Sequence, residues 1–253
     1  CEAKAIHHQM EDEQLEIDVG SIILSPGFDE FEPSLKTEYG YGRFPNVVSS
    51  IEFERFLSAS GPFKGQILRP SDGKHPKRVA WIQCVGSRDS HIGKGYCSSV
   101  CCMYATKEAV IAKEHAPEIE PTIFYMDMRA YGKNFDKYIE RAKKDYGVRY
   151  IRSRVSHVKE NQTTNQLTIH YETEEGEMVS EGFDLVVLSV GLEPTRHHQE
   201  ISKIFGIDLN PYGFAKTSTC YPLQTSRPGI FVSGVFSGPK DVPETVAQAS
   251  AVA

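Results

Sequence analysis

Residues 78–115 read RVAWIQCVGSRDSHIGKGYCSSVCCMYATKEAVIAKEH, and they pass directly from an apolar strand into a helix. Residues 78–85 are rich in apolar and β-branched side chains, which is typical of a buried parallel strand. Residues 98–115 place apolar side chains at helical spacing, and Pro117 prevents this helix from continuing. The segment predicts one β–α unit of an α/β fold, with cysteines concentrated in the turn between its strand and its helix.

The same alternation continues after this unit. The sequence predicts a strand at residues 121–126, an amphipathic helix at 135–147 that ends at its glycine, and another strand at 148–153. This β–α–β–α–β order implies a parallel sheet with right-handed crossovers. Alternating segments between residues 155 and 188, separated by turn residues, predict an antiparallel meander that leads back into the sheet.

Residues 15–24 resemble a buried parallel strand, as residues 185–190 do, and residues 229–233 are predicted to form a last strand. We predict that residues 76–189 form one complete nucleotide-binding-like domain. Residues 1–75 and 190–253 are predicted to pair as the two parts of a second domain. That second domain lacks its first strand and its Gly-rich phosphate loop, so we expect it to be truncated.

Composition excludes several classes of protein. The chain has 253 residues, of which 40% are hydrophobic and 25% are charged, enough apolar material for a substantial core. Its net charge of −6 and the lack of a basic stripe argue against nucleic-acid binding. No apolar run approaches the ~20 residues that span a bilayer, and the N-terminus lacks the apolar stretch of a signal peptide. Because the chain starts at Cys1 rather than at Met, we interpret it as a fragment of a longer polypeptide.

Four cysteines are grouped where the strand meets the helix. Cys84 lies at the end of the strand, and Cys97, Cys101 and Cys102 lie at the start of the helix. Four thiolates at such a turn can hold one [4Fe–4S] cluster, and the helix N-terminus favours their negative charge. This grouping also predicts a reducing compartment, which we take to be the cytoplasm.

Three other interpretations of the cysteines stay open. Zinc also accepts four thiolates, although adjacent ligands are unusual in zinc sites. A redox disulfide needs only two of Cys97, Cys101 and Cys102 in a suitable geometry. The cysteines could also be buried together without a ligand, which their tight grouping disfavours. Cys220 is isolated, and we predict that it is a structural thiol.

The cysteine-rich turn stands where a dinucleotide-binding domain has its G-x-G-x-x-G loop. Only Gly86 of that pattern is present, so we predict that NAD(P)H does not bind there in the usual way. Asp127 follows the next strand, at the position of a ribose-binding acid, but without the loop we expect an ordinary strand-end acid. Arg88 and Lys94 are predicted to offset the charge of the cluster.

Residues 225–253 contain a strand, a Gly-rich turn and the start of a helix. They are similar to the turn that, in flavoprotein disulfide reductases, holds a helix N-terminus against the pyrimidine edge of the flavin. Reduced flavin is negative there, and a helix N-terminus stabilises that charge. A lysine in the turn is expected to raise the flavin potential. The predicted flavin-binding residues are Gly27, Gly234, Val235, Phe236, Gly238, Lys240, Asp241, Val242 and Pro243.

The whole chain resembles the HdrA component of heterodisulfide reductase. The resemblance rests on residues 81–89 and 96–109 around the cysteines, on VGLEPT at 190–195, and on residues 229–253. It implies a three-layer, thioredoxin-reductase-like flavoprotein with two dinucleotide-binding domains. The central domain is then NAD(P)-binding-like, and the truncated domain is FAD-binding-like. It also implies FAD, a [4Fe–4S] cluster on the four cysteines, and partner subunits that carry further iron–sulfur clusters.

The sequence therefore predicts an oxidoreductase subunit that passes electrons between FAD and a [4Fe–4S] cluster, and that could also form a homodimer. No side chain is assigned as an acid, base or nucleophile, because the cofactors carry the chemistry. Without the Gly-rich loop we expect weak flavin binding, and the fragment need not be active alone. The alternatives are an NAD(P)H-dependent disulfide oxidoreductase with a redox cysteine pair, and a zinc-stabilised assembly module.

Overall fold

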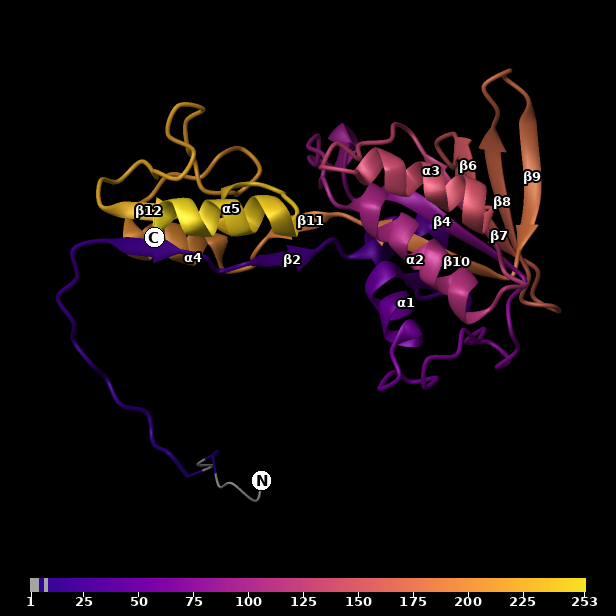
Figure 1. Ribbon diagram of the computed structural model, residues 1–253, viewed down its shortest axis with the longest axis horizontal. Coiled ribbons are helices and arrows are strands. Elements are labelled where there is room, and N and C mark those ends of the chain that lie inside the picture. Colours follow the sequence, from indigo (N-terminus) through magenta and orange to yellow (C-terminus); the bar gives the residue numbers. More distant parts are fainter. Residues whose placement is uncertain (1–4, 7–8) are drawn as a thin grey trace.

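The computed structural model describes residues 5–6 and 9–253, and it has two units joined by a pair of short strands (Figure 1). The larger unit contains the cysteine-rich segment, and the smaller unit contains the C-terminal helix. The joining strands, β2 (Phe28–Glu30) and β11 (Leu192–Pro194), pair antiparallel. The chain therefore crosses between the two units twice.

The larger unit is built on a five-stranded parallel sheet in the order β3-β10-β4-β5-β6. Its middle part has the expected β–α–β–α–β order. Helix α2 begins at Cys101 rather than at Ser98, because Ser99 has a φ of 64°, which a right-handed helix does not accept. The elements are β4 (Arg78–Val85), α2 (Cys101–His115), β5 (Glu120–Tyr125), α3 (Phe135–Tyr146) and β6 (Arg149–Arg152).

The sheet begins earlier in the chain than the sequence suggests. β3 (Val47–Ser49) pairs in parallel with the fully buried β10 (Leu185–Val190), and α1 (Ser50–Leu57) follows β3 directly. The expected boundary after residue 75 is therefore corrected, since β3 and α1 belong to the larger unit. A three-residue strand is too short to show a periodic pattern, which explains the error.

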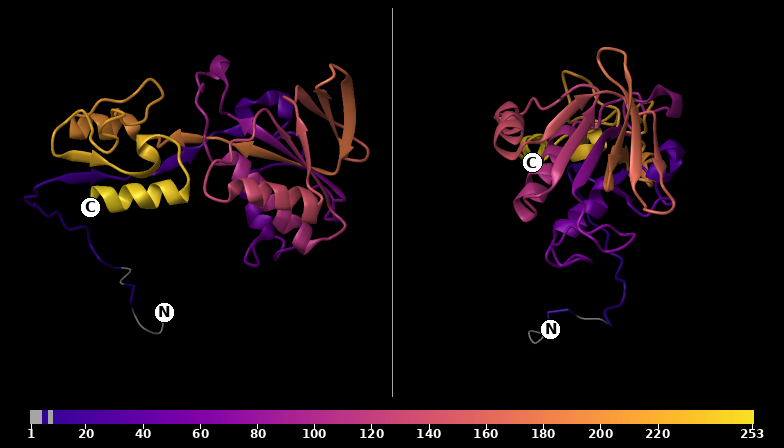
Figure 2. Two further views of the ribbon diagram at one scale, coloured as in Figure 1. Left: turned by 45° about the horizontal axis from the view of Figure 1, so that its top comes forward. Right: turned by 90° about the vertical axis from the view of Figure 1, so that its right-hand side faces the viewer.

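The parallel sheet is covered by helices on one side and by a second sheet on the other, which gives three layers (Figure 2). Neighbouring residues of β4 face opposite layers: Trp81 packs with α1 and α2, and Ile82 packs with the second sheet. The second sheet is the expected antiparallel meander, and the three-layer α/β fold is confirmed. Its strands are β7 (His157–Glu160), β8 (Leu167–Glu172) and β9 (Met178–Phe183).

In the smaller unit, β1 (Ile22–Leu24) pairs in parallel with β12 (Ile230–Val232), so the two flanking pieces of the sequence do meet. The strand expected over residues 15–24 is only three residues long. Its N-terminal part is exposed and has no neighbouring strand among the residues that the structure describes.

The remaining elements of the whole chain are short helices. They are η1 (Pro33–Leu35), η2 (Thr37–Tyr39), η3 (Ser90–Ile92), α4 (His198–Phe205), η4 (Gly234–Ser237) and α5 (Val242–Val252).

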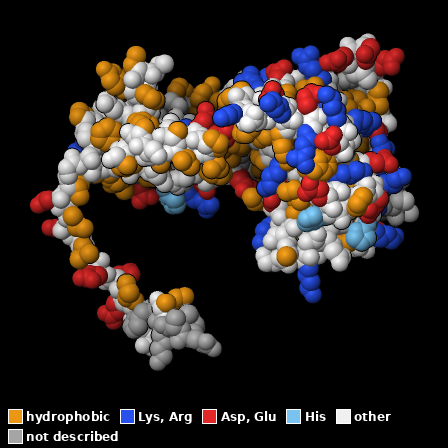
Figure 3. Space-filling model, in the orientation of Figure 1, with side chains coloured by type: hydrophobic (Ala, Val, Ile, Leu, Met, Phe, Trp, Pro, Cys, Tyr) orange, Lys and Arg blue, Asp and Glu red, His pale blue; other side chains and the backbone are white. Residues whose placement is uncertain are grey.

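The two units differ in surface character. Charges of both signs alternate over the larger unit, whereas hydrophobic side chains are frequent over the smaller unit (Figure 3). Val242 and Val246 of α5 are 75% and 58% exposed, and none of the side chains of this helix is buried. No helix in the described part of the chain is long and apolar enough to cross a membrane.

Candidate cofactor sites

The tip of β4 has an unusual backbone. Cys84 has a φ of 62°, and the pairing of β4 with β10 shifts register at this point. A left-handed conformation at a residue other than glycine costs about 1–3 kcal/mol and is concentrated at functional sites. Gly86 and Arg88 follow with φ values of 78° and 54°. The strand therefore ends in a strained turn that re-orients Cys84 relative to the alternation of the strand.

The loop after β4 folds back on itself and brings Cys97 towards Cys84. Asp89 and Lys94 exchange both backbone hydrogen bonds at 2.9 Å, and the Arg88 amide donates to the Tyr96 carbonyl at 2.8 Å. Next to Cys97, the buried Ser98 hydroxyl accepts a 2.9 Å hydrogen bond from the Leu192 amide. The loop is thus fixed both internally and against the start of β11.

Backbone groups surround the sulfurs of the helix cysteines. The Ser99 amide donates to Cys97 Sγ at 3.4 Å, and the Arg129 amide donates to Cys102 Sγ at 3.4 Å. Cys101 Sγ lies 3.8 Å from the Val190 carbonyl oxygen. Amides that donate to sulfur favour the thiolate, which is the form that binds iron.

The pKa values of the predicted ligands depend on burial and on one another. Burial raises the pKa of Cys84 to about 11, with a further contribution from Cys102 that Arg88 opposes. Burial also raises the pKa of Cys101, and Cys84 raises it further. For Cys102, burial raises the pKa against the effect of the Arg129 amide. Without a bound metal these three thiols are therefore protonated at neutral pH.

These properties bear on the alternatives for the cysteines. A reactive redox cysteine normally has a lowered pKa, which is the opposite of what burial does here. Among residues 5–6 and 9–253, no three Cys, His, Asp or Glu side chains converge closely enough to hold a single metal ion. Zinc needs all its sulfurs at about 2.3 Å from one point. A four-iron cluster instead binds each of its cysteines through a separate iron.

A cleft of about 1100 Å³ lies beside the cysteine segment. Its wall on the larger unit includes Ser99, Val100, Met103 and Tyr104, from the loop and first turn of α2. Its wall on the smaller unit includes seven of the nine residues predicted to bind flavin. These are Gly27, Gly234, Val235, Lys240, Asp241, Val242 and Pro243.

Two predicted flavin residues do not line this cleft. Phe236 is completely buried in the core of the smaller unit, where it packs with β1 and β12. Gly238 ends the short helix η4 and has a φ of 136°, a conformation accessible essentially to glycine alone. Both residues therefore stabilise the conformation of the turn. The sequence alone does not distinguish a residue with this structural role from one that contacts the ligand.

Lys240 is buried and is held by the turn itself. Its Nζ donates to the Gly234 carbonyl at 2.8 Å and to the Ser237 hydroxyl at 2.7 Å, and it also contacts the Gly238 carbonyl. Burial lowers the pKa of Lys240 to about 8. The lysine therefore fixes the turn and supplies a charge that depends on pH.

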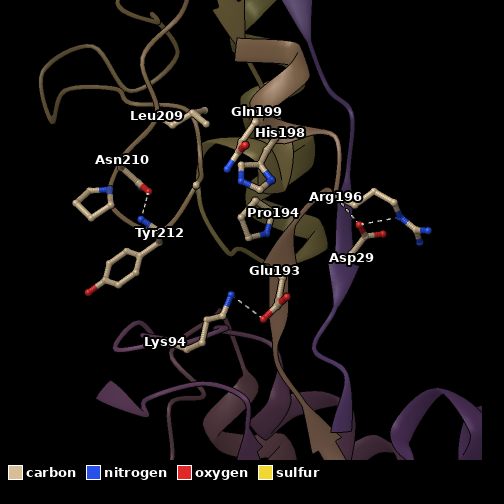
Figure 4. A pocket seen from close by; sticks show the side chains of 12 residues that line it. Asp29, Lys94, Glu193, Pro194, Arg196, His198, Gln199, Leu209, Asn210 and Tyr212 are labelled. Atoms are coloured by element: carbon tan, nitrogen blue, oxygen red, sulfur yellow. Dashed lines mark hydrogen bonds and ion pairs between the residues drawn. The ribbon is translucent and has the colours of Figure 1, made fainter. Parts of the chain in front are cut away.

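Lys94, predicted to offset the cluster charge, lies instead in a separate pocket of about 440 Å³ (Figure 4). There it forms an ion pair with Glu193 at 2.8 Å, while Asp29 and Arg196 pair across the same pocket. None of the four cluster cysteines lines this pocket. Arg88 is the cation that acts on Cys84.

Sequence reasoning missed two side chains on α2 that line the cleft. Glu108 is 1% exposed, and its Oε2 accepts a 2.8 Å hydrogen bond from Trp81 Nε1, while its Oε1 has no partner in the described chain. Burial raises the pKa of Glu108 well above its ordinary value. Tyr104 lies one turn after Cys101. The spacing of these residues from the cysteines was visible in the sequence, but the cleft was not.

The comparisons with known proteins agree with this architecture. Residues 2–253 match the family model described as pyridine nucleotide-disulphide oxidoreductase. The chain belongs to this family. A solved structure of 2-naphthoyl-CoA reductase with 2-naphthoyl-CoA has a TM-score of 0.50 and 11% identity, and the match covers 89% of this chain and 25% of that chain. At that identity the likeness supports the fold alone.

The sequence relatives confirm the resemblance to HdrA. Over 255 residues, the chain is 43% identical to the HdrA component of the H(2):CoB-CoM heterodisulfide,ferredoxin reductase of Methanothermobacter thermautotrophicus. It is 47% identical, again over 255 residues, to an HdrA-type iron-sulfur component of the CoB--CoM heterodisulfide reductase of Methanopyrus kandleri. Each match covers 100% of this chain and 39% of the relative, so the chain spans about two fifths of their length.

Proposed function

We propose that this chain is the electron-transfer module of a heterodisulfide-reductase-like oxidoreductase, in which FAD and a [4Fe–4S] cluster exchange electrons. One observation carries the proposal: Ser99 and Val100 line the cleft and also lie between Cys97 and Cys101. A flavin in this cleft would be separated from the cluster only by the segment that leads into α2. Two cofactors on opposite sides of this one segment would be close enough to exchange electrons.

Each part of the site has a defined task in this proposal. The thiolates of Cys84, Cys97, Cys101 and Cys102 would hold the cluster, which supplies one-electron chemistry when bound. Arg88 would offset its negative charge near Cys84. The cleft residues of the smaller unit would bind and orient the flavin, and the side chains of Val100 and Met103 would exclude water from it.

The pairing of the strand-end acid with an arginine supports this assignment over a direct NAD(P)H reductase. Arg88 Nη2 pairs with Asp127 at 2.7 Å, so the strand-end acid already has a cationic partner. That ion pair lowers the pKa of Asp127. A carboxylate bound to arginine is a poor acceptor for ribose hydroxyls, and only Gly86 of the phosphate loop is present.

The partners follow from the same proposal. The relatives are named as components of heterodisulfide reductases, and one of them is named as an iron-sulfur component. We propose that this chain passes electrons to other iron–sulfur subunits of such a complex. The buried thiols require a reducing compartment before metal loading, which favours the cytoplasm. A homodimer stays a prediction.

Anaerobic purification with iron, sulfide and flavin analysis tests the function. We expect about four irons and four sulfides per chain, and a broad visible absorbance that bleaches on reduction. A colourless chain with stoichiometric zinc would support the assembly-module alternative instead. Reduction of an added disulfide by NAD(P)H that is lost on Cys97→Ser would support a disulfide oxidoreductase. Either result contradicts the proposal.

A further inference from the structure

Tyr104 connects the cleft to the cysteine site. It lies three residues after Cys101, so both side chains lie on the same face of α2. Its hydroxyl donates a 2.7 Å hydrogen bond to the Val190 carbonyl oxygen, and Cys101 Sγ approaches the same oxygen at 3.8 Å. Tyr104 also lines the cleft, as does Val190. The phenol therefore lies between the cleft and a predicted ligand sulfur.

Cys101 is the least solvent-exposed of the four cysteines. Its residue is 4% exposed, so water has little access to its sulfur. Burial raises the pKa of Cys101, Cys84 raises it further, and the nearby Tyr104 hydroxyl opposes that rise. Cys97 and Cys102 instead receive backbone amides, and Cys84 is close to Arg88. A side-chain hydroxyl from the cleft wall is thus particular to Cys101 in this group.

We propose that Tyr104 tunes the reduction potential of the cluster by donating its hydroxyl hydrogen to Cys101 Sγ. The inference rests on the proposed function, because it needs iron on Cys101. A thiol can donate to the Val190 carbonyl, but an iron-bound thiolate has no hydrogen to donate and becomes an acceptor. The Tyr104 hydroxyl hydrogen rotates to suit its acceptor, and Cys101 Sγ lies beside the Val190 oxygen that this hydroxyl binds. It is therefore the donor available to that sulfur.

The direction of the effect follows from charge. Reduction adds an electron to the cluster, and part of the added negative charge lies on the ligand sulfurs. A hydrogen bond to sulfur therefore stabilises the reduced form more than the oxidised form and raises the potential. Because Tyr104 also lines the cleft, a flavin bound there would contact the same residue that sets the potential of its electron partner.

The test compares Tyr104→Phe with the wild-type chain, both purified anaerobically with their iron. Redox titrations followed by electron paramagnetic resonance give the midpoint potential of the cluster. We expect the variant to be harder to reduce by about tenfold in equilibrium constant, which for one electron is about 59 mV towards negative potential. Tyr138→Phe is the matched control, because Tyr138 lines the same cleft but lies on α3, away from the cysteine segment.

The outcomes separate this inference from the function on which it rests. An unshifted midpoint in a Tyr104→Phe chain with four irons would overturn the tuning role and leave the proposed function intact. A variant that loses its irons or fails to fold would also overturn it, by giving the hydroxyl a structural role. A wild-type chain without a cluster would overturn the proposed function itself. Equal shifts in both tyrosine variants would show a general effect of the cleft, contrary to the inference.

Discussion

The β4–α2 turn and the β12–α5 turn are built from the same parts, a strand, a turn and a helix, but they treat the helix N-terminus differently. Helix α5 begins with a capping box, in which Asp241 accepts from the Glu244 amide at 2.9 Å and Glu244 reaches back. Helix α2 begins after Val100 without any side-chain cap. The N-terminus of α5 is capped by its own side chains, whereas that of α2 has no side-chain cap.

This difference indicates which turn is specialised for a charged group. The uncapped N-terminus of α2 is surrounded by the predicted cluster ligands, where its amides and positive end favour thiolates. At α5 the capping carboxylate already occupies that position. The sequence led us to expect the α5 N-terminus to stabilise reduced flavin. With the cap in place, the exposed side chain of Val242 is the more accessible part of that turn.

The largest expected effect comes from removing a ligand at the uncapped turn. Cys101→Ser should lower the iron content from about four per chain to about three or fewer, because serine is a poor ligand for iron–sulfur clusters. Cys220→Ser is the control, since Cys220 is exposed and lies in the smaller unit. Iron analysis under anaerobic conditions measures both. Unchanged iron in Cys101→Ser would remove this turn from the site.

The strained backbone of the cysteine turn gives the next effect. A Cβ on Gly86 would lie 1.9 Å from Phe31 Cγ, and its φ of 78° disfavours any side chain. Gly86→Ala should therefore lower the free energy of unfolding by about 3 kcal/mol, from overpacking and left-handed strain together. Gly93→Ala in the same loop is the control, because it has a φ of 71° but open space around its Cβ. It should cost about 1 kcal/mol.

Denaturant titrations of both glycine variants measure these costs. If the two alanines destabilise the chain equally, close packing of Phe31 against the turn makes no contribution. The cost at Gly86 would then come from its backbone conformation alone.

Another difference is that α2 buries a carboxyl group, whereas the acids at the start of α5 are near the surface. Burial raises the pKa of Glu108 in the folded state, so above its unfolded pKa of about 4.3 the folded chain binds more protons than the unfolded chain. The stability contribution of this group is therefore full below that pH and is lost as pH rises. Glu108→Gln should weaken the loss of stability that occurs as pH rises above the unfolded pKa of about 4.3.

Urea unfolding midpoints at several pH values test this sign. The glutamine variant keeps an oxygen acceptor for Trp81 Nε1, so packing is preserved. Glu114→Gln is the control, because Glu114 lies on the same helix and its hydrogen bond to Tyr146 is exposed. Identical pH profiles for Glu108→Gln and wild type would show that Glu108 stays ionised in the folded chain.

The sequence predicted what depends on burial and periodicity, and it missed what depends on neighbours in space. The six residues of β10 are all buried and formed a clear apolar run. Residues 15–24 showed a similar run, but most of them find no strand to pair with in the described chain. The cysteine grouping was visible because the ligands are close in sequence. Tyr104 and Glu108 acquire significance only from the cleft and from the Val190 and Trp81 contacts across the sheet.

The smallest expected effect tests the capped turn directly. Asp241→Ala removes the oxygen that accepts from the Glu244 amide and should lower the free energy of unfolding by about 1 kcal/mol. Asp241→Asn keeps an oxygen at that position and should cost only a few tenths of that, which makes it the matched control. Thermal unfolding measures both.

Flavin binding to the same two variants tests whether the cap affects the ligand. If the cap only stabilises the helix, the flavin affinity of both variants will fall slightly and by a similar amount. If the carboxylate repels reduced flavin, both variants will bind it more tightly, and the flavin midpoint will rise in each. Because Asp241→Asn keeps the cap, that second result would mean that the charge of the Asp241 carboxylate, and not the cap itself, opposes reduced flavin at α5.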